Sequence, residues 1–500
     1  MFARIAALSG WRADASMVAF GLLSALALPP FYLSPILLLA IPALLAAIGA
    51  THGFRSAFRR GWCFGFGSNL LGLYWITEAI LFEADRFWWL VPLAVPALSA
   101  VMGLFVGLAA AVAQRARPGW PLALALAGAW TMTDLVRQFI LSGFPWNPMG
   151  SVWEMPNGAG DAMIQPAAAI GIHGLTLATL IVAAAPTLRW RGRSVALALL
   201  LLWACGGLAR IAGNTDGATG ATRVVVVQGN VPQGQKWDRS LVNTIFDRYL
   251  RLTADGLRRA GTASAVVVWP ETASPFQLET DAGARQAIAE VTGSAVALVG
   301  SVRFGPDGRP RNTLFALTAG GTISRIFDKW HLVPFGEYQP SWAQVGIQLV
   351  PGGGFASGPG PQTLTVPGIP PAGPLICYEA IFSGQVIDRA DRPAWMVNVT
   401  NDAWFGNSSG PRQHLAAARM RAVEEGLPLI RAANTGISAI FDAYGHEIAR
   451  LGMRQTGTLV EALPPPLPPT PYSRFGLWVP AILALASLVA GLFGSRPTQR

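Results

Sequence analysis

Long apolar stretches separated by short polar connections fill residues 1–210, and one more apolar stretch lies near the carboxyl end. Each is close to the length of about 20 mainly apolar residues that a helix needs to cross a bilayer. Residues 211–472 have instead the mixed composition of a folded domain in water. The pattern predicts about eight membrane spans. They are residues 15–33, 34–51, 61–82, 88–113, 119–136, 166–188, 194–210 and 475–494.

This pattern divides the chain into three predicted parts. Residues 1–210 form a membrane domain of seven spans, residues 211–472 form a domain outside the bilayer, and residues 473–500 form the eighth span and a tail. A Gly/Thr-rich segment, 215–220, and a Pro-rich segment, 463–471, have the composition of linkers at the two ends of the middle part.

Arginines gather in alternate connections between the predicted spans and after the last one. Because cytoplasmic loops carry the excess of positive charge, both termini are expected in the cytoplasm and residues 211–472 on the other side. Ala25-Leu26-Ala27 also resembles a signal-peptide cleavage site, and loss of the first span is the less favoured alternative because a second span follows immediately. The arginines are Arg4, Arg12, Arg55, Arg59, Arg60, Arg115, Arg117, Arg189, Arg191, Arg193, Arg496 and Arg500.

The composition supports a membrane protein. Hydrophobic residues make up 52% of the chain and charged residues only 13%, against about 25% charged residues in ordinary soluble proteins. A fully soluble enzyme and a disordered chain are therefore excluded. The net charge is +10, but no run of basic residues is interleaved with aromatic ones, so the sequence predicts no nucleic-acid partner.

Within residues 211–472, runs of β-branched residues alternate with segments of helical period. This alternation predicts β-sheets covered by helices. The predicted strands are 223–227, 265–269, 295–301, 375–377, 395–399 and 429–432, and the predicted helices are 240–257, 282–291, 380–389 and 413–425.

Two of the predicted strands end in polar residues that suit catalysis. Glu271 follows the strand 265–269, and Cys377 ends the strand 375–377 directly before the predicted helix 380–389. Functional groups of such folds collect at the carboxyl ends of strands. A thiol at a helix start is also expected to have a lowered pKa. Cys377 is therefore a candidate nucleophile, with a buried structural cysteine as the alternative.

Lysine is rare in this chain, which draws attention to Lys329. Lys236 and Lys329 are the two lysines, and every other basic side chain apart from histidine is arginine. An ammonium differs from a guanidinium in shape, hydration and pKa, so Lys329 suggests a position where a compact cation is required. Chance survival of two lysines is the alternative. Glu337 lies eight residues further on and is a candidate partner for Lys329.

Other catalytic patterns are weaker. Gly406 to Gly410 spells Gly-x-Ser-x-Gly around Ser408, but a polar loop separates it from the preceding strand, so the sharp turn of a nucleophile elbow is not expected. His331 and His414 have no nearby ligand at metal-binding spacing. The sequence predicts neither a metal nor any other cofactor.

The order of these motifs resembles a known family. Glu271 in WPE, Lys329 in FDKWHLVPFGE and Cys377 in ICYEAIF resemble the Glu-Lys-Cys triad of the nitrilase superfamily. Combined with seven preceding spans and one following span, the whole chain is similar to the apolipoprotein N-acyltransferases of the bacterial cytoplasmic membrane. Two further stretches match, QGNVPQ followed by Trp237 and NDAWFG containing Trp404.

The resemblance implies an αββα sandwich in the periplasm. It also implies transfer of a fatty acyl chain from a phospholipid, typically phosphatidylethanolamine, through a thioester. The acceptor is the α-amino group of the diacylglyceryl-cysteine at the N-terminus of an apolipoprotein, so the expected partners are these two lipid-bearing substrates and the surrounding membrane lipids.

The resemblance also implies roles for individual residues. Glu271 acts as the base, Lys329 stabilises the oxyanion and Cys377 is the nucleophile. The supporting and substrate-binding roles fall on a second set of residues. In that set Glu337 orients Lys329, and Tyr378 and Glu379 support the site. Trp237 and Trp404 flank the lipid entrance, with ordinary packing as the alternative for both.

Two other functions are compatible with parts of the pattern. A membrane-anchored amidase of the nitrilase type would use the same triad on a small amide, although eight spans exceed what an anchor requires. A non-catalytic binding platform or a transporter would not need the triad, and the predicted spans hold few charged groups for an ion path.

Overall fold

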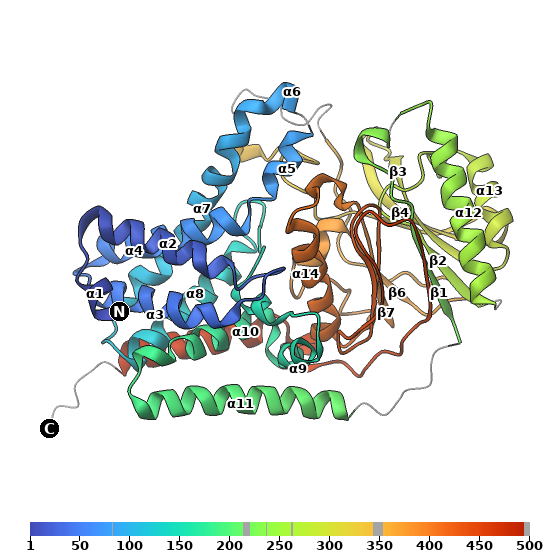
Figure 1. Ribbon diagram of the computed structural model, residues 1–500. Coiled ribbons are helices and arrows are strands. Elements are labelled where there is room, and N and C mark those ends of the chain that lie inside the picture. The colour runs from blue at the N-terminus through green and yellow to red at the C-terminus, as the bar shows by residue number, and fades with distance from the viewer. Residues whose placement is uncertain (83, 214–220, 237, 262–263, 344–353, 495–500) are drawn as a thin grey trace. The chain divides into compact units, whose positions relative to one another are not determined.

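The computed structural model describes residues 1–82, 84–213, 221–236, 238–261, 264–343 and 354–494, which fold into two compact units (Figure 1). The first unit comprises Met1–Asn214, Ser408–Ala416 and Arg474–Arg500. The second comprises Thr215–Asn407 and Ala417–Ser473. Each unit has its own hydrophobic core.

The first unit is built from helices, and one of the longer helices overlaps each of the eight stretches predicted as spans. The longer helices are α2 (Gly10–Ala25), α3 (Leu37–Gly49), α4 (Phe54–Gly72), α7 (Val91–Ala113), α8 (Trp120–Arg137), α10 (Ala167–Ala183), α11 (Trp190–Ala212) and α16 (Trp478–Phe493). The short helices are α1 (Phe2–Ala6), α5 (Ile76–Leu81), α6 (Ala84–Phe87), α9 (Gly158–Ile164) and α15 (Pro471–Phe475), the last of which lies across the boundary of the units.

Length and composition separate these helices into two groups. Within the described ranges, three helical segments are long and apolar enough to cross a membrane, namely Trp88–Ala113, Ala167–Thr187 and Trp190–Ala212. Ser34–Gly49 and Trp478–Phe493 are apolar but shorter. The chain therefore has apolar helices suited to a bilayer, and the total of eight spans stays a prediction.

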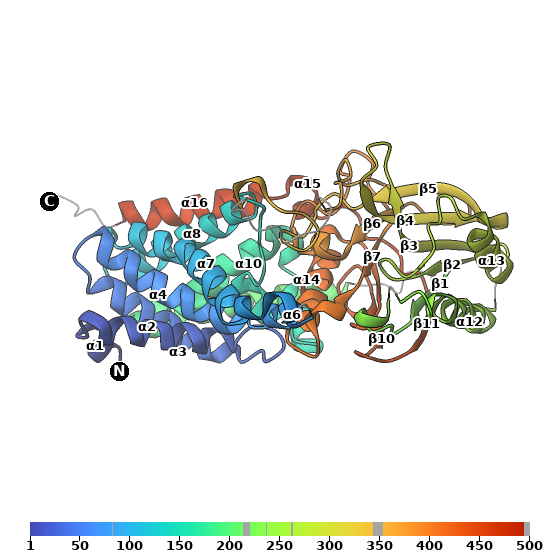
Figure 2. The same cartoon turned by 90° about the horizontal axis from the view of Figure 1, so that it is seen from above.

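Helices α2, α4 and α7 pack through glycine, and they lie side by side in Figures 1 and 2. A Cβ added to Gly21 of α2 would lie 2.1 Å from the carbonyl oxygen of Phe64 in α4. One added to Gly61 of α4 would lie 2.6 Å from the carbonyl oxygen of Val106 in α7. Only glycine allows the backbones to approach this closely, which is a common device of helices that associate in membranes.

Two β-sheets form the centre of the second unit. In the first sheet the strand order is β11-β1-β2-β3-β4-β5, and in the second it is β10-β9-β8-β7-β6. Strands β1, β2 and β3 are parallel to one another, as are β6, β7 and β8, and the remaining pairings are antiparallel. The strands are β1 (Arg223–Gln228), β2 (Ala265–Val268), β3 (Val296–Phe304), β4 (Pro310–Thr318), β5 (Thr322–Asp328), β6 (Ala372–Ile376), β7 (Trp395–Thr400), β8 (Leu429–Ala433), β9 (Ser438–Phe441), β10 (Glu447–Leu451) and β11 (Gly457–Ala462).

Alternate residues of β1 serve two different cores. Val224 and Val226 pack in the core between the two sheets, together with residues of β7 such as Val397. Val225 and Val227 pack in a second core, under the helices α12 (Val242–Ala260) and α13 (Ala282–Thr292). Because successive side chains of a strand point to opposite faces, an uninterrupted valine run fits a strand that is buried on both sides.

The apolar residues of the helices decide which of their faces packs on a sheet. Helix α12 presents Ile245, Phe246 and Tyr249 to the sheet, and Gly261, whose φ of 63° suits glycine, caps its carboxyl end. Helix α14 (Gly410–Glu425) begins in the first unit and continues in the second. The six strands predicted from the sequence are confirmed, and so are the predicted helices that correspond to α12, α13 and α14.

Candidate active site

The end of β2 places Glu271 in the interior of the second unit. After Val268 the chain makes a turn through Glu271 and Thr272, and Thr272 has a φ of 46°, a left-handed conformation that β-branched residues rarely adopt. Gly300 of β3 allows this turn to approach the sheet. A Cβ at Gly300 would lie 2.2 Å from the carbonyl oxygen of Pro270 and 2.8 Å from Cα of Glu271.

The carboxylate of Glu271 is 6% exposed and receives hydrogen bonds at both oxygens. Nδ2 of Asn312 lies 2.6 Å from Oε1, and the backbone nitrogen of Asn401 lies 2.7 Å from Oε2. Burial by itself raises the pKa of Glu271, but the charges of Lys329 and Lys236 and these hydrogen bonds together hold it below its usual value. Glu271 is therefore ionised at neutral pH and able to accept a proton.

Lys329 follows β5 directly and is 1% exposed. Its Nζ lies 2.8 Å from Oε1 of Glu337 and 3.5 Å from Oε1 of Glu271. Burial by itself lowers the pKa of Lys329, but the two carboxylates raise it above its usual value. Nδ2 of Asn312 also donates to Glu337 at 3.2 Å. The ammonium is therefore charged and is held between two carboxylates.

Glu337 is fixed from its other side. Its Oε2 accepts a hydrogen bond at 2.8 Å from the backbone nitrogen of Val333, which closes the chain between Lys329 and Glu337 into a compact loop. The expected pairing of Lys329 with Glu337 is thus present in the geometry.

Cys377 lies at the end of β6 and is 7% exposed. Its φ is 52°, so the nucleophile candidate occupies a strained backbone position of the kind that concentrates at functional sites. The helix predicted at 380–389 is wrong. A short 3-10 helix of 5 residues, Cys377–Ile381, follows the strand instead, and Gly384 with a φ of 75° turns the chain away.

The expected effect of a helix dipole on the thiol is wrong as well. Burial and then the negative charge of Glu271 raise the pKa of Cys377, and Lys329 and a hydrogen bond with Thr400 oppose this only in part. The resting sulfur is therefore a thiol. It requires a base to become a nucleophile, and Glu271 is the ionised carboxylate whose charge it senses most.

Glu379 connects the segments that carry Cys377 and Lys329. Its Oε2 accepts from the backbone nitrogen of Ile376 at 2.6 Å, and its Oε1 accepts from the backbone nitrogen of Trp330 at 2.7 Å. Burial raises the pKa of Glu379 to about 8, although these backbone donors favour the carboxylate. Tyr378 is buried and packs edge-to-face on Phe382 with ring centroids 5.2 Å apart.

Of the two tryptophans predicted at a lipid entrance, the structure describes only Trp404. Trp404 lies in the 3-10 helix Asp402–Phe405 and is 39% exposed. Trp237 lies outside the described residues.

Ser408, in the Gly-x-Ser-x-Gly pattern, belongs to the first unit, where its Oγ accepts a hydrogen bond at 3.1 Å from the backbone nitrogen of Gly410. No strand leads directly into it.

Three residues of this site were missed by the sequence analysis. Lys236 donates from Nζ to the carbonyl oxygen of Glu271 at 3.1 Å and to Oγ1 of Thr272. Because the chain has only two lysines, Lys236 could have been identified as a candidate on the same ground as Lys329. Asn401, after β7, begins the matching stretch NDAWFG, which was a signal for it. Asn312, in the unpredicted strand β4, carried no comparable signal.

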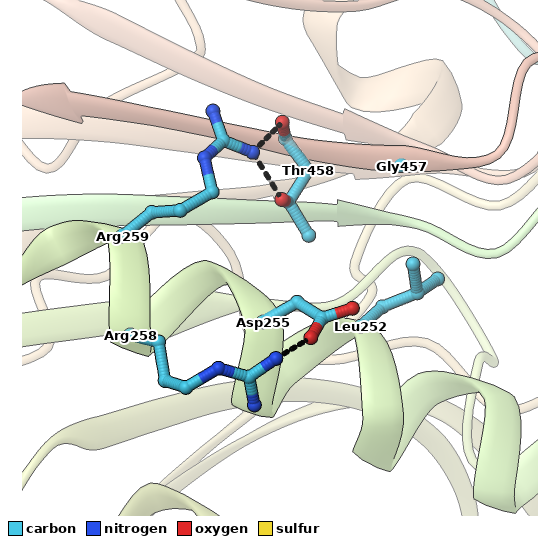
Figure 3. Close-up of a pocket in the computed structure, with 6 residues that line it drawn as sticks. All are labelled: Leu252, Asp255, Arg258, Arg259, Gly457 and Thr458. Carbon is cyan, nitrogen blue, oxygen red and sulfur yellow. Dashed lines mark hydrogen bonds and ion pairs between the residues drawn. The ribbon is translucent and has the colours of Figure 1, made fainter.

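A shallow cavity of about 470 Å³ lies elsewhere on the second unit, between α12 and β11 (Figure 3). Arg259 there donates to the backbone and the hydroxyl of Thr458, and Arg258 pairs with Asp255. None of the residues around Glu271 lines it. The cavity therefore contributes nothing to the candidate active site.

Family models match both parts of the chain. Residues 223–467 match the carbon-nitrogen hydrolase family, and residues 20–185 match the N-terminal domain of apolipoprotein N-acyltransferase. A solved amidase from Nesterenkonia sp. is 19% identical with a TM-score of 0.37, covering 50% of this chain and 92% of the amidase. The family match over residues 223–467 and the two sheets make the second unit an α/β domain of the carbon-nitrogen hydrolase class.

Curated relatives extend this match over nearly the whole chain. The apolipoprotein N-acyltransferase of Rhodopseudomonas palustris is 38% identical, over 98% of this chain and 96% of its own length. That of Bradyrhizobium diazoefficiens is also 38% identical, over 96% of this chain and 95% of its own length. This chain belongs to the apolipoprotein N-acyltransferase family.

Proposed function

We propose that this protein transfers a fatty acyl chain from a membrane phospholipid to the α-amino group of the N-terminal diacylglyceryl-cysteine of apolipoproteins. One observation carries the proposal beyond family membership: Glu271 and Lys329 form a buried ion pair at 3.5 Å, and the charges of both act on the buried thiol of Cys377. Apolar helices in the same chain suit substrates that are themselves lipids.

In the first half-reaction, Glu271 accepts the proton of Cys377 while the sulfur attacks the ester carbonyl carbon of the phospholipid. Lys329 stabilises the oxyanion, and the backbone at Tyr378 is a second candidate donor. One such preorganised donor is typically worth about 3–4 kcal/mol. The carbon–oxygen bond then breaks, and Glu271 returns its proton to the oxygen of the departing lysophospholipid. The acyl chain remains on Cys377 as a thioester.

The pKa values explain why the base is needed at this step. The pKa of Cys377 lies above its usual value and that of Glu271 below it, so proton transfer in the resting site is unfavourable. The proton therefore moves as the sulfur attacks and the negative charge passes to the oxyanion beside Lys329. This arrangement keeps the sulfur unreactive until a substrate is bound.

In the second half-reaction, the amine of the apolipoprotein attacks the thioester. Glu271 accepts a proton from the attacking nitrogen, the carbon–sulfur bond breaks, and the proton returns to the sulfur to restore the thiol of Cys377. A thioester reacts with an amine more readily than an oxygen ester does, so this step needs no further activation. Because the lysophospholipid leaves before the second lipid arrives, the kinetics are ping-pong.

The supporting residues and the cellular placement complete the proposal. Glu337 orients Lys329, Glu379 and Tyr378 support the segment of Cys377, and Trp237 and Trp404 flank the lipid entrance. The chain crosses the bacterial inner membrane about eight times, with both termini in the cytoplasm and residues 211–472 in the periplasm, and the donor is phosphatidylethanolamine. The arginine pattern and the apolar helices support this placement.

The thioester is the most direct test. We expect the detergent-solubilised protein, incubated with phosphatidylethanolamine and no acceptor, to gain the mass of one acyl chain and to lose it in hydroxylamine. Cys377→Ala should gain nothing. Cys205→Ala is the matched control, because Cys205 is an exposed cysteine outside the site, and it should still be acylated. Intact-protein mass spectrometry gives the readout.

Two results would contradict the mechanism. One is a folded parent protein that shows no acyl adduct with this donor, and the other is an adduct that persists in Cys377→Ala. The first outcome would remove phosphatidylethanolamine as the donor, and the second would remove Cys377 as the nucleophile.

A further inference from the structure

Lys236 is a buried cation that the mechanism above leaves without a role. It follows the 3-10 helix Gln233–Gln235 and is 6% exposed. A lysine is almost never buried to this extent unless its ammonium has strong partners. The partners of Lys236 are therefore a guide to its purpose.

Those partners belong to the turn that carries the proposed base. Nζ of Lys236 donates to the carbonyl oxygen of Glu271 at 3.1 Å and to Oγ1 of Thr272. Thr272 is the residue with the left-handed φ of 46°. The ammonium therefore holds the strained residue on one side of the turn, while the bare Cα of Gly300 allows the close approach on the other.

A second connection links the same segment to the carboxylate of Glu271. Oε1 of Gln233 accepts a hydrogen bond at 2.8 Å from Nδ2 of Asn401, and the backbone nitrogen of Asn401 donates to Oε2 of Glu271. The segment from Gln233 to Lys236 thus reaches both the backbone and, through Asn401, the side chain of Glu271. Loss of Lys236 leaves only one of these two connections.

Lys329 alone does not balance the negative charge of Glu271. Lys329 lies closer to Glu337, at 2.8 Å, than to Glu271, at 3.5 Å, so much of its charge is balanced by Glu337. The charge of Lys236 helps to hold the pKa of Glu271 below its usual value. Burial lowers the pKa of Lys236 itself to about 8, and the carboxylate of Glu271 opposes that shift.

We propose that Lys236 is a positioning residue of this site, whose ammonium fixes the Glu271–Thr272 turn and supplies the second positive charge that keeps Glu271 ionised beside Cys377. The proposal rests on the assignment of Glu271 as the base. It makes the segment that ends at Lys236 part of the machinery that activates the thiol.

The test measures thiol activation without any lipid substrate. In the full-length protein with Cys63→Ala and Cys205→Ala, Cys377 is the remaining cysteine, and its rate of alkylation by iodoacetamide is followed from pH 6 to pH 10. Removal of a nearby positive charge raises the pKa of an acid. At pH 6 to 7, where Lys236 is charged, we expect the alkylation rate of Lys236→Met to be shifted about tenfold below that of the parent. This shift should shrink above pH 8, where Lys236 of the parent loses its own proton.

Two further variants separate this role from a general effect on folding. Arg248→Met is the matched control, because Arg248 also donates to loop carbonyls, those of Gly229 at 3.1 Å and Asn230 at 3.5 Å, and its profile should follow the parent. Lys236→Arg keeps the charge and should recover part of the shift. An unshifted profile in Lys236→Met, or an equal shift in Arg248→Met, overturns the proposal.

Thr272→Val covers the case in which Lys236→Met does not fold. It removes one acceptor of the ammonium and keeps the lysine, so a smaller shift in the same direction is expected, and no shift overturns the proposal. Alkylation needs no acyl donor. Failure of the lipid reaction in the parent protein is therefore distinguishable from failure of the role given to Lys236.

Discussion

At the scale of single residues, the candidate site works by balancing charges that burial alone would suppress. Glu271, Lys329 and Lys236 are each no more than 6% exposed, and an isolated charge at such a position would be lost by a shift in pKa. Glu271 keeps its charge because the two cations act on it, and Lys329 keeps its charge because the carboxylates of Glu337 and Glu271 lie beside it. Substitution of one member should therefore change the protonation of the rest, which is why pH profiles report on this site better than activity at a single pH.

The turn at Glu271 leads to a prediction about Gly300. A methyl group there would meet the carbonyl oxygen of Pro270 at 2.2 Å and Cα of Glu271 at 2.8 Å. We expect Gly300→Ala to lower the free energy of unfolding by about 1–3 kcal/mol, a typical cost of overpacking. It should also slow thioester formation, because the carboxylate is displaced. Thermal melting and single-turnover acylation give the two readouts.

Gly283 provides the control for this substitution. It lies near the start of α13, and the nearest atom to an added Cβ, Oδ1 of Asp281, is 3.4 Å away. Gly283→Ala should therefore melt at or above the temperature of the parent protein, since alanine favours helix. A Gly300→Ala variant with unchanged melting and acylation would show that the turn has more room than the geometry indicates.

At the scale of elements, the starts and ends of strands and helices decide where chemistry is possible. The sequence analysis found β2 and β6, whose ends carry Glu271 and Cys377, because their residues are continuously apolar. It missed β5 and β10, in which polar and charged residues are mixed with apolar ones and exposure is mixed. Strands of this kind depend on their partners for stability, so a local pattern identifies them poorly.

Helix α14 carries a second prediction at this scale, because its first turns belong to the first unit. Nε2 of Gln413 donates to the carbonyl oxygens of Pro29 at 3.1 Å and Gly72 at 3.3 Å, and Oε1 accepts from Nε1 of Trp146 at 2.8 Å. Gln413→Leu leaves buried polar groups without these bonds. The free energy of unfolding should fall by about 1–3 kcal/mol, which thermal melting in detergent measures.

The control for Gln413 is Gln286→Leu. Gln286 lies on the exposed side of α13, where its side chain bonds only weakly to Glu290 at 3.4 Å. Its removal should leave the melting temperature within experimental error. Equal melting of the two variants would mean that the bonds of Gln413 contribute no net stability.

At the scale of the whole molecule, the proposed orientation in the membrane has a direct test. Asp307 lies in an exposed turn of the second unit, and Arg55 lies exposed in an arginine-bearing connection of the first. We expect a membrane-impermeant maleimide to label Asp307→Cys in intact cells and to label Arg55→Cys only after the inner membrane is opened. The parent protein gives the background of its own cysteines. The reverse pattern would overturn the predicted orientation.

The sequence by itself determined the apolar helices, the central strands and the family of this protein. Apolar runs and arginine-bearing connections indicated the membrane-suited helices, continuous valine runs indicated the central strands, and the order of Glu271, Lys329 and Cys377 indicated the family. These features depend on properties that neighbouring residues share, such as burial on both faces of a strand, and so they are visible along the chain.

Only the tertiary structure decided the protonation states of the site residues and the partners that hold them in place. The helix expected after Cys377 is a 3-10 helix of 5 residues, and the thiol pKa is raised rather than lowered. Asn312 and Lys236 reach Glu271 from 41 and 35 residues away along the chain. Contacts of this kind arise where separate elements meet, and burial changes a pKa only once the fold has excluded water. Neither effect can be predicted from residues that are neighbours in the sequence.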